Sequence, residues 1–114
     1  VMVGIIDWEL SSIGAQGLDV GWLLMMSDAE CWDWSWKPLT TLSGSELLAA
    51  YRQAAGPSLA HAEWFEALAA YRMGAIACLN VKLHRTGKRP DELWEKFAPS
   101  ISHLFARASQ LLQG

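Results

Sequence analysis

The first nine residues constrain the fold of this chain more than any other stretch of its sequence. Five of the first six residues are apolar, and four of those five are Val or Ile. This composition favours a buried β-strand over a helix. The apolar run stops abruptly at Asp7. An acidic residue at a strand end lies at the rim of a sheet, which is where α/β and kinase-like folds place their ligands.

A second carboxylate lies close to the first, because Glu9 comes two residues after Asp7. In an extended chain both side chains point to one side, and Trp8 points to the other side, where it can anchor. Two carboxylates beside a strand end suit a hard cation such as Mg2+, which takes oxygen ligands and keeps several waters. A second interpretation stays open, in which Asp7 caps a turn through Ser11 and Ser12 and Glu9 is solvated.

The strand expected over residues 1–6 lacks a partner, because no second strand pattern follows it in the sequence. An unpaired strand leaves backbone donors and acceptors unsatisfied, which costs free energy if the strand is buried. The partner strand is therefore expected from residues outside this chain, or from another copy in a homodimer. Because the chain also starts at Val1 rather than Met, we interpret it as the C-terminal piece of a longer protein.

A loop and then a helix are predicted after this strand. Residues 9–17 include Gly14 and Gly17, which permit backbone angles that other residues avoid. The helix is expected over residues 18–26, with Asp19 near its start, where a carboxylate interacts favourably with the helix dipole. Few positions of this helix are polar, which predicts that it is mostly buried.

A second helix is predicted by a capping box. Ser43 and Glu46 have the required spacing and precede an apolar run. The helix is expected over residues 44–55, and Gly56-Pro57 is an ordinary stop signal.

The longest periodic run predicts a helix over residues 61–85 that ends before Gly87 and is central to the packing. Asp91 is expected to cap a last helical region, which packs on the long helix. Pro99 should break or kink that region.

An irregular segment over residues 27–42 carries several aromatic rings, and Pro38 argues against a strand there. The rings surround one acidic residue and could stack on a cationic or planar substrate, which makes them candidates for a substrate pocket. The alternative is that they pack onto the core or onto a missing part of the protein. The candidate residues are Trp32, Asp33, Trp34 and Trp36.

A local basic cluster lies at the end of the long helix. It could hold a phosphate or a carboxylate, or it could complement the helix C-terminus with its remaining members solvated. Its members are Lys82, His84, Arg85, Lys88 and Arg89.

Composition narrows the class of protein. A chain of 114 residues fits one small domain. Its net charge is −3, whereas nucleic-acid-binding domains are typically basic. No apolar run in the sequence is long enough to span a membrane. The two cysteines belong to no CxxC motif, which favours a reduced, cytoplasmic setting. Seven tryptophans are many for this length and indicate an apolar surface that packs against something else.

The N-terminal block resembles that of a known enzyme family. Gly4-Ile5-Ile6-Asp7-Trp8-Glu9, then Gly14, then Leu18-Asp19-Val20-Gly21-Trp22, is similar to the hydrophobic-Asp-Trp-Glu … Gly … Asp-Leu block of the aminoglycoside phosphotransferase family. The branch it resembles most occurs as stand-alone bacterial phosphotransferases and fused to some acyl-CoA dehydrogenases. Weaker resemblance to the C-terminal helices of that branch lies in Trp64-Phe65, Tyr71-Arg72, Leu83-His84-Arg85 and Arg107.

This resemblance implies a protein-kinase-like α+β fold, in which the chain is the mostly α, C-terminal part of the helical lobe with one strand lacking its sheet partner. Asp7 is then the counterpart of the kinase DFG aspartate and holds the Mg2+ of ATP or another nucleoside triphosphate. Glu9 is a further candidate near the metal, and Asp19 and Gly14 support the site. The phosphate acceptor would be a hydroxyl group of a small molecule.

Two parts of the family pattern are missing from the chain. The sequence contains no His-Gly-Asp-x-x-x-x-Asn catalytic loop and no nucleotide-binding lobe with its lysine. The catalytic base is therefore expected upstream, and this chain alone is expected to be inactive. The alternative function is a non-catalytic helical module that uses its apolar surface to bind a partner or to dimerise.

Overall fold

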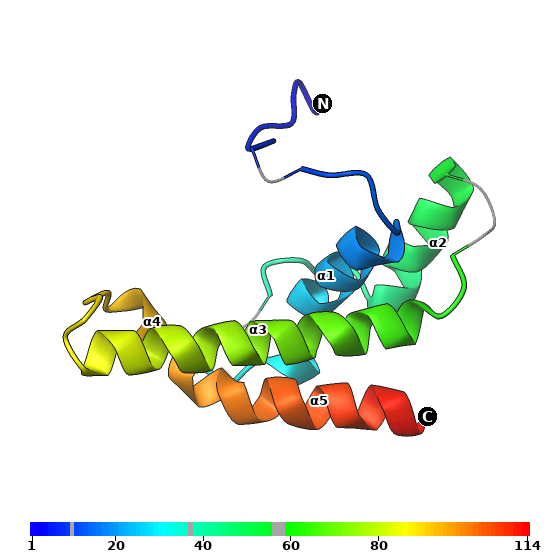
Figure 1. Cartoon of the computed structure of the whole chain (residues 1–114). Coiled ribbons are helices and arrows are strands. Elements are labelled where there is room, and N and C mark those ends of the chain that lie inside the picture. Colours follow the sequence, from blue (N-terminus) through cyan, green and yellow to red (C-terminus); the bar gives the residue numbers. More distant parts are fainter. Residues whose placement is uncertain (10, 37, 56–58) are drawn as a thin grey trace.

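The computed structural model of this chain describes residues 1–9, 11–36, 38–55 and 59–114. Most of the described residues are helical and none of them is in a β-strand, which confirms the mostly α class (Figure 1). The elements are α1 (Gly17–Ser27), the 3₁₀ turn η1 (Ala29–Cys31), α2 (Gly44–Ala55), α3 (Ala62–Arg85), α4 (Leu93–Phe97), the 3₁₀ turn η2 (Ala98–Ser100) and α5 (Ile101–Gln113).

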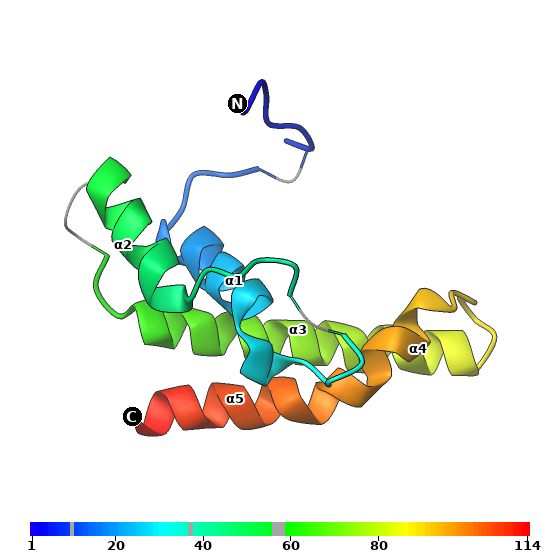
Figure 2. The same ribbon diagram turned by 180° about the vertical axis from the view of Figure 1, so that it is seen from behind.

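The long helix α3 is central to the packing, as its periodicity predicted: α1 and α5 pack on it, and α2 packs on α1. Figures 1 and 2 show α5 running antiparallel beside α3, with α1 packed on α3 as well. The core lies between these three helices and the η1 turn. Its buried members are Met25, Cys31, Trp32, Ala67, Ala69, Ala70, Met73, Leu104 and Ala108.

Small residues let α1 and α3 approach closely. Gly21 faces the backbone of Phe65, and a Cβ atom added at Gly21 would collide with the Phe65 carbonyl. Because backbone cannot rotate away as a side chain can, this position requires glycine. The prediction that α1 is mostly buried holds for its α3 side and is wrong for Leu18 and Leu23, which are exposed.

The capping box at the start of α2 is confirmed. Ser43 N donates to the Glu46 carboxylate at 2.7 Å, and Glu46 N donates to Ser43 Oγ at 3.2 Å. These two bonds satisfy backbone donors that have no partner inside the helix. The predicted stop at Gly56-Pro57 lies outside the described residues.

The signals at the end of α3 and after it are also confirmed. The helix ends at Arg85, and Gly87 follows with a φ of 71°, a conformation that favours glycine. The Asp91 carboxylate accepts a hydrogen bond from Leu93 N at 3.0 Å and so caps the start of α4. Pro99 lies in η2, where it separates α4 from α5.

The strand expected over residues 1–6 does not form, and this part of the fold prediction is wrong. The segment is irregular and exposed, and Figure 1 shows it leading away from the helices. The physical reason is the absence of a pairing edge, because the described residues contain no other strand to accept its backbone hydrogen bonds. Apolar, β-branched composition favours a strand only where a neighbouring strand or a packed face is present.

Candidate functional site

The chain turns at Asp7 instead of continuing straight. The backbone of Asp7 adopts a left-handed conformation with a φ of 69°, which aspartate tolerates better than most residues. Trp8 Nε1 donates to the Ile5 carbonyl at 2.8 Å, and Ser11 N donates to the Trp8 carbonyl at 2.9 Å. The extended conformation that would place Asp7 and Glu9 on one side is therefore absent at this point.

Three residues of the N-terminal block surround one hollow. Asp7, Gly14 and Asp19 line a cavity of about 480 Å3 between the N-terminal segment and the start of α1. We call it the Asp7 hollow. Its apolar lining includes Ile5, Ile6, Trp8 and Leu18. Glu9 is exposed and is not part of this lining.

The acidic residues that line the Asp7 hollow are Asp7 and Asp19, which are too few to hold a metal ion by side chains alone. No group of three or more His, Cys, Asp and Glu side chains is arranged for a metal within the described ranges. Mg2+ is often bound by one or two carboxylates, with substrate phosphates and waters completing its octahedron. Asp7 supplies a carboxylate of the required kind, and Asp19 lies around the same cavity.

Asp19 lies in the first turn of α1, and the residue at the helix N-cap is Gln16. The Asp19 side chain is exposed, and its carboxylate makes no hydrogen bond or ion pair with the residues that the structure describes. The Asp19 carboxylate still interacts favourably with the positive, N-terminal end of the helix dipole.

The segment over residues 32–36, which we call the tryptophan loop, has a packed part and an exposed part. Trp32 is buried, and its Nε1 donates to the Met25 carbonyl at 3.2 Å. The ring centroids of Trp32 and Trp36 are 4.2 Å apart, and both rings pack against Phe97. These two rings follow the packing alternative, whereas Trp34 is exposed.

Asp33 is committed to local contacts. Its carboxylate accepts a hydrogen bond from Ser35 N at 3.0 Å and lies 3.8 Å from Nε2 of His103. The hydrogen bonds from Ser35 hold the pKa of Asp33 below its usual value. The Asp33 backbone N–H donates a hydrogen bond to the buried Ser100 hydroxyl at 2.9 Å.

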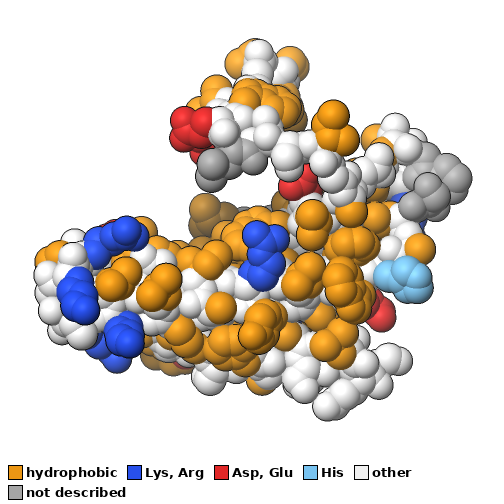
Figure 3. Space-filling view, in the orientation of Figure 1, with side chains coloured by type: hydrophobic (Ala, Val, Ile, Leu, Met, Phe, Trp, Pro, Cys, Tyr) orange, Lys and Arg blue, Asp and Glu red, His pale blue; other side chains and the backbone are white. Residues whose placement is uncertain are grey.

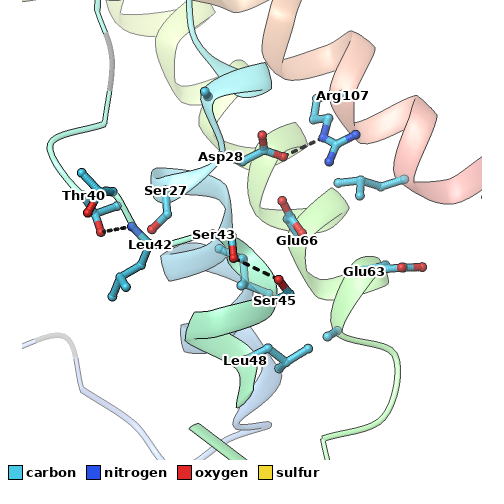
Figure 4. A pocket seen from close by; sticks show the side chains of 16 residues that line it. Ser27, Asp28, Thr40, Leu42, Ser43, Ser45, Leu48, Glu63, Glu66 and Arg107 are labelled. Carbon is cyan, nitrogen blue, oxygen red and sulfur yellow. Dashed lines mark hydrogen bonds and ion pairs between the residues drawn. The ribbon is translucent and has the colours of Figure 1, made fainter. Parts of the chain in front are cut away.

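A second polar group lies deeper, among the helices. Asp28 follows α1, Glu66 lies on α3 and Arg107 lies on α5. Arg107 Nε donates to the Asp28 carboxylate at 2.7 Å, and Figure 4 shows the Glu66 carboxyl group pointing toward this pair. We call these three residues the inner cluster. They line a cavity of about 640 Å3, whose lining also includes Ser45 and Leu48 of α2 and Ser43, which directly precedes that helix.

The inner cluster changes the acid–base behaviour of two groups. Burial, a hydrogen bond from the protonated acid to Asp28 and the negative charge of Asp28 raise the pKa of Glu66 to about 7. Burial and the neighbouring carboxylates of Asp28 and Glu66 raise the pKa of the Cys31 thiol to about 12. At neutral pH Cys31 is therefore a neutral thiol in the core, while Glu66 is close to its midpoint.

The inner cluster was not predicted, although the sequence contains one signal that points to it. Glu66 occupies the same helical face as Ala70, Met73 and Ala77, which are all buried. An acidic residue on the apolar face of a predicted central helix requires a partner, because burying an isolated charge is costly.

Two members of the basic cluster at the end of α3 make contacts that neither sequence interpretation named. Arg85 donates two hydrogen bonds to the Glu95 carboxylate, at 2.8 and 2.9 Å. His84 Nδ1 accepts a hydrogen bond from Asp91 N at 2.8 Å. These contacts tie the end of α3 to the segment that contains α4.

Comparisons with family models, with curated proteins and with solved structures find no match to this chain. Within the described residues, no helix combines the length and the apolar character that crossing a membrane requires.

Proposed function

We propose that this chain is the C-terminal part of an ATP-dependent phosphotransferase that acts on a hydroxyl group of a small molecule in the cytoplasm. The observation that carries the proposal is the shared position of Asp7, Gly14 and Asp19 around one hollow. These residues are two of the three acidic positions and one of the glycine positions of the block that resembles the aminoglycoside phosphotransferase family. A protein-kinase-like fold for the intact protein belongs to the same proposal.

In this proposal Asp7 contributes negative charge where the phosphates bind. Phosphoryl transfer depends mainly on positioning and on the neutralisation of developing charge. When bound, Mg2+ would supply that neutralisation, with Asp7 as its ligand. Asp19 would stabilise the start of α1 through the helix dipole, whereas neither the backbone angles nor the surroundings of Gly14 require a glycine. The base that accepts the hydroxyl proton would come from residues upstream of this chain.

The proposal limits the contribution of the tryptophan loop to acceptor binding. Trp32 and Trp36 are occupied by packing, so Trp34, with its exposed ring, is the tryptophan of this loop that an acceptor could contact. Asp33 would influence the acceptor only indirectly, because its carboxylate is bound by Ser35.

The first test is the coding sequence before Val1. The proposal predicts a His-Gly-Asp-x-x-x-x-Asn stretch within roughly 20 residues upstream, since this loop supplies the base and a second metal ligand. A different upstream sequence without such a loop would remove the main support for an enzyme.

The second test uses the intact protein and does not require the acceptor to be known. Mg2+-dependent binding of a non-hydrolysable ATP analogue is measured by calorimetry for the wild type, for Asp7→Asn and for the control Glu9→Gln. An amide keeps the shape of Asp7 but loses the charge that attracts Mg2+, so Asp7→Asn should lose the Mg2+ dependence. Glu9→Gln should retain it, because Glu9 does not line the hollow. Unchanged Mg2+ dependence in Asp7→Asn would contradict the metal role.

A second candidate function is favoured by an apolar groove between α3 and α5. The groove has a volume of about 350 Å3, and Figure 3 shows hydrophobic side chains gathered along these helices. Its lining includes Trp64, Tyr71 and Leu112, each more than half exposed. Such a surface suits a helical module that binds a partner or forms a homodimer. Sedimentation equilibrium tests the homodimer. If this function is right, the wild-type chain associates, and Trp64→Ser weakens the association.

A further inference from the structure

The inner cluster joins three segments that are far apart in the sequence. Asp28 follows α1 and accepts a hydrogen bond from Glu30 N in η1, Glu66 belongs to α3, and Arg107 belongs to α5. The side chains of Asp28 and Arg107 are only 15% and 27% exposed. Their contact therefore lies largely out of water, where a hydrogen-bonded ion pair is stronger than on a surface.

The charges of the cluster balance only when Glu66 carries a proton. The Glu66 carboxyl group points toward the Asp28–Arg107 ion pair (Figure 4), so the net charge of the three groups is zero while Glu66 is neutral. Ionised Glu66 would place two carboxylates beside one guanidinium in a partly buried site. The other titratable groups that face Glu66 in the described part of the chain are Glu63 on α3, which is exposed, and the neutral Cys31 thiol. Neither of them supplies a compensating positive charge.

We propose that Asp28, Glu66 and Arg107 form a proton-dependent latch, which holds the segment after α1 against α3 and α5 while Glu66 is protonated and loosens when Glu66 ionises. The segment that the latch holds contains the buried residues Cys31 and Trp32. Loosening it would open the cavity that the inner cluster lines between these helices.

The direction of the pH effect follows from proton linkage. In the folded protein burial and Asp28 raise the pKa of Glu66 from 4.5 to about 7. Between these values the closed form binds more protons than the open or unfolded form, so its stability falls as the pH rises. Below this range the latch is at its strongest, and above it no further loss from Glu66 is expected.

Cys31 provides a direct probe of the latch because its thiol is fully buried next to Asp28. The exposed Cys78 is first replaced by Ser, so that one thiol remains. The rate of Cys31 labelling by 4,4′-dithiodipyridine is then measured from pH 5 to pH 8, for the 114-residue chain and for its Glu66→Gln variant. Glutamine stays neutral and can donate to Asp28, so the variant imitates the protonated latch. Taking the ratio of the two rates cancels the pH dependence of thiol chemistry.

The proposal predicts that the ratio of wild-type to Glu66→Gln labelling rises at least tenfold between pH 5 and pH 8. Over the same range the melting temperature of the wild type should fall relative to that of Glu66→Gln. Glu63→Gln is the matched control, because it makes the same change one turn away at an exposed position, and it should follow the wild type. A constant labelling ratio with parallel melting curves would overturn the proposal.

Two further measurements keep the test decisive if Glu66→Gln fails to fold. The labelling rate of native wild-type chain, divided by that of the denatured chain at each pH, should still rise at least tenfold. Asp28→Asn should reduce this rise, because Arg107 is then free to neutralise ionised Glu66. The same rise in Asp28→Asn as in the wild type, or no rise in the wild type, would contradict the latch.

Discussion

Asp7 and Asp28 each follow an apolar stretch of sequence, but their carboxylates lie in opposite surroundings. Asp7 is exposed at the edge of the Asp7 hollow, and its neighbourhood is defined by a local turn. Asp28 is largely buried, and Arg107 binds it from a helix that is distant in sequence. The comparison separates two uses of an aspartate. The first leaves a charge accessible to a ligand, whereas the second uses the charge to join elements of the fold.

This difference predicts that substitutions around Asp28 change the free energy of unfolding, whereas substitutions around Asp7 leave it nearly unchanged. The following substitutions test this contrast in the 114-residue chain, and their effects are measured by thermal and urea unfolding.

Arg107→Ala should have the largest effect. It leaves Asp28 without its partner in a partly buried site, and losing a hydrogen bond between charged groups costs about 1.5–3 kcal/mol. Arg85→Ala is the matched control, because the Arg85–Glu95 pair lies on the surface, where water and salt screen such pairs and they contribute little to stability. Equal losses for the two variants would show that the inner cluster contributes no more than a surface pair.

Gly21→Ala should destabilise the chain although alanine is the better helix former. The propensity gain is at most about 1 kcal/mol, whereas overpacking against the Phe65 backbone costs typically about 1–3 kcal/mol. Gly44→Ala is the control, because a Cβ there makes only an ordinary contact with Leu24, at 3.5 Å. A Gly21→Ala protein as stable as the wild type would mean that α1 and α3 are not packed this closely.

Ser43→Ala should cost about 0.5–2 kcal/mol through loss of the capping box of α2. The loss should be accompanied by a lower helix content at temperatures just below the melting transition. Ser45→Ala removes a hydroxyl from the same helix start without removing the cap, and its effect should be smaller.

Asp19→Ala should have the smallest effect on unfolding. Its carboxylate acts on the first turn of α1 through the helix dipole, an interaction of about 0.3–1 kcal/mol that salt screens. The loss of stability should therefore be smaller in 1 M NaCl than in 0.1 M NaCl, because the Debye length falls from about 10 Å to about 3 Å. A larger loss that does not depend on salt would indicate that the Asp19 carboxylate accepts a direct hydrogen bond.

Local signals made much of the helical fold predictable from sequence. Ser43 and Glu46 specify the start of α2 through contacts four residues apart or fewer, and Asp91 and Pro99 act equally locally. The error over residues 1–6 arose because a strand depends on a partner, which no property of the segment itself supplies. The inner cluster escaped prediction because it requires knowing that α1 and α5 meet on α3.

The candidate site was predictable to a smaller extent. The resemblance named Asp7, Gly14 and Asp19 together, and the structure places the three around one hollow. The orientation of Glu9 was not predictable, because it follows from the left-handed backbone at Asp7, which strand periodicity does not anticipate. The fate of Trp32 and Trp36 depended on Phe97, which approaches them only in the folded chain.

Residue-resolved hydrogen exchange of the 114-residue chain tests most directly the claim that the helices hold themselves together while the Asp7 segment depends on pairing outside them. The account predicts strong protection of the α3 amides over residues 67–81 and none for residues 3–6. Protection of residues 3–6 in a chain shown by sedimentation to be monomeric would contradict it, because those amides would then be paired within the chain.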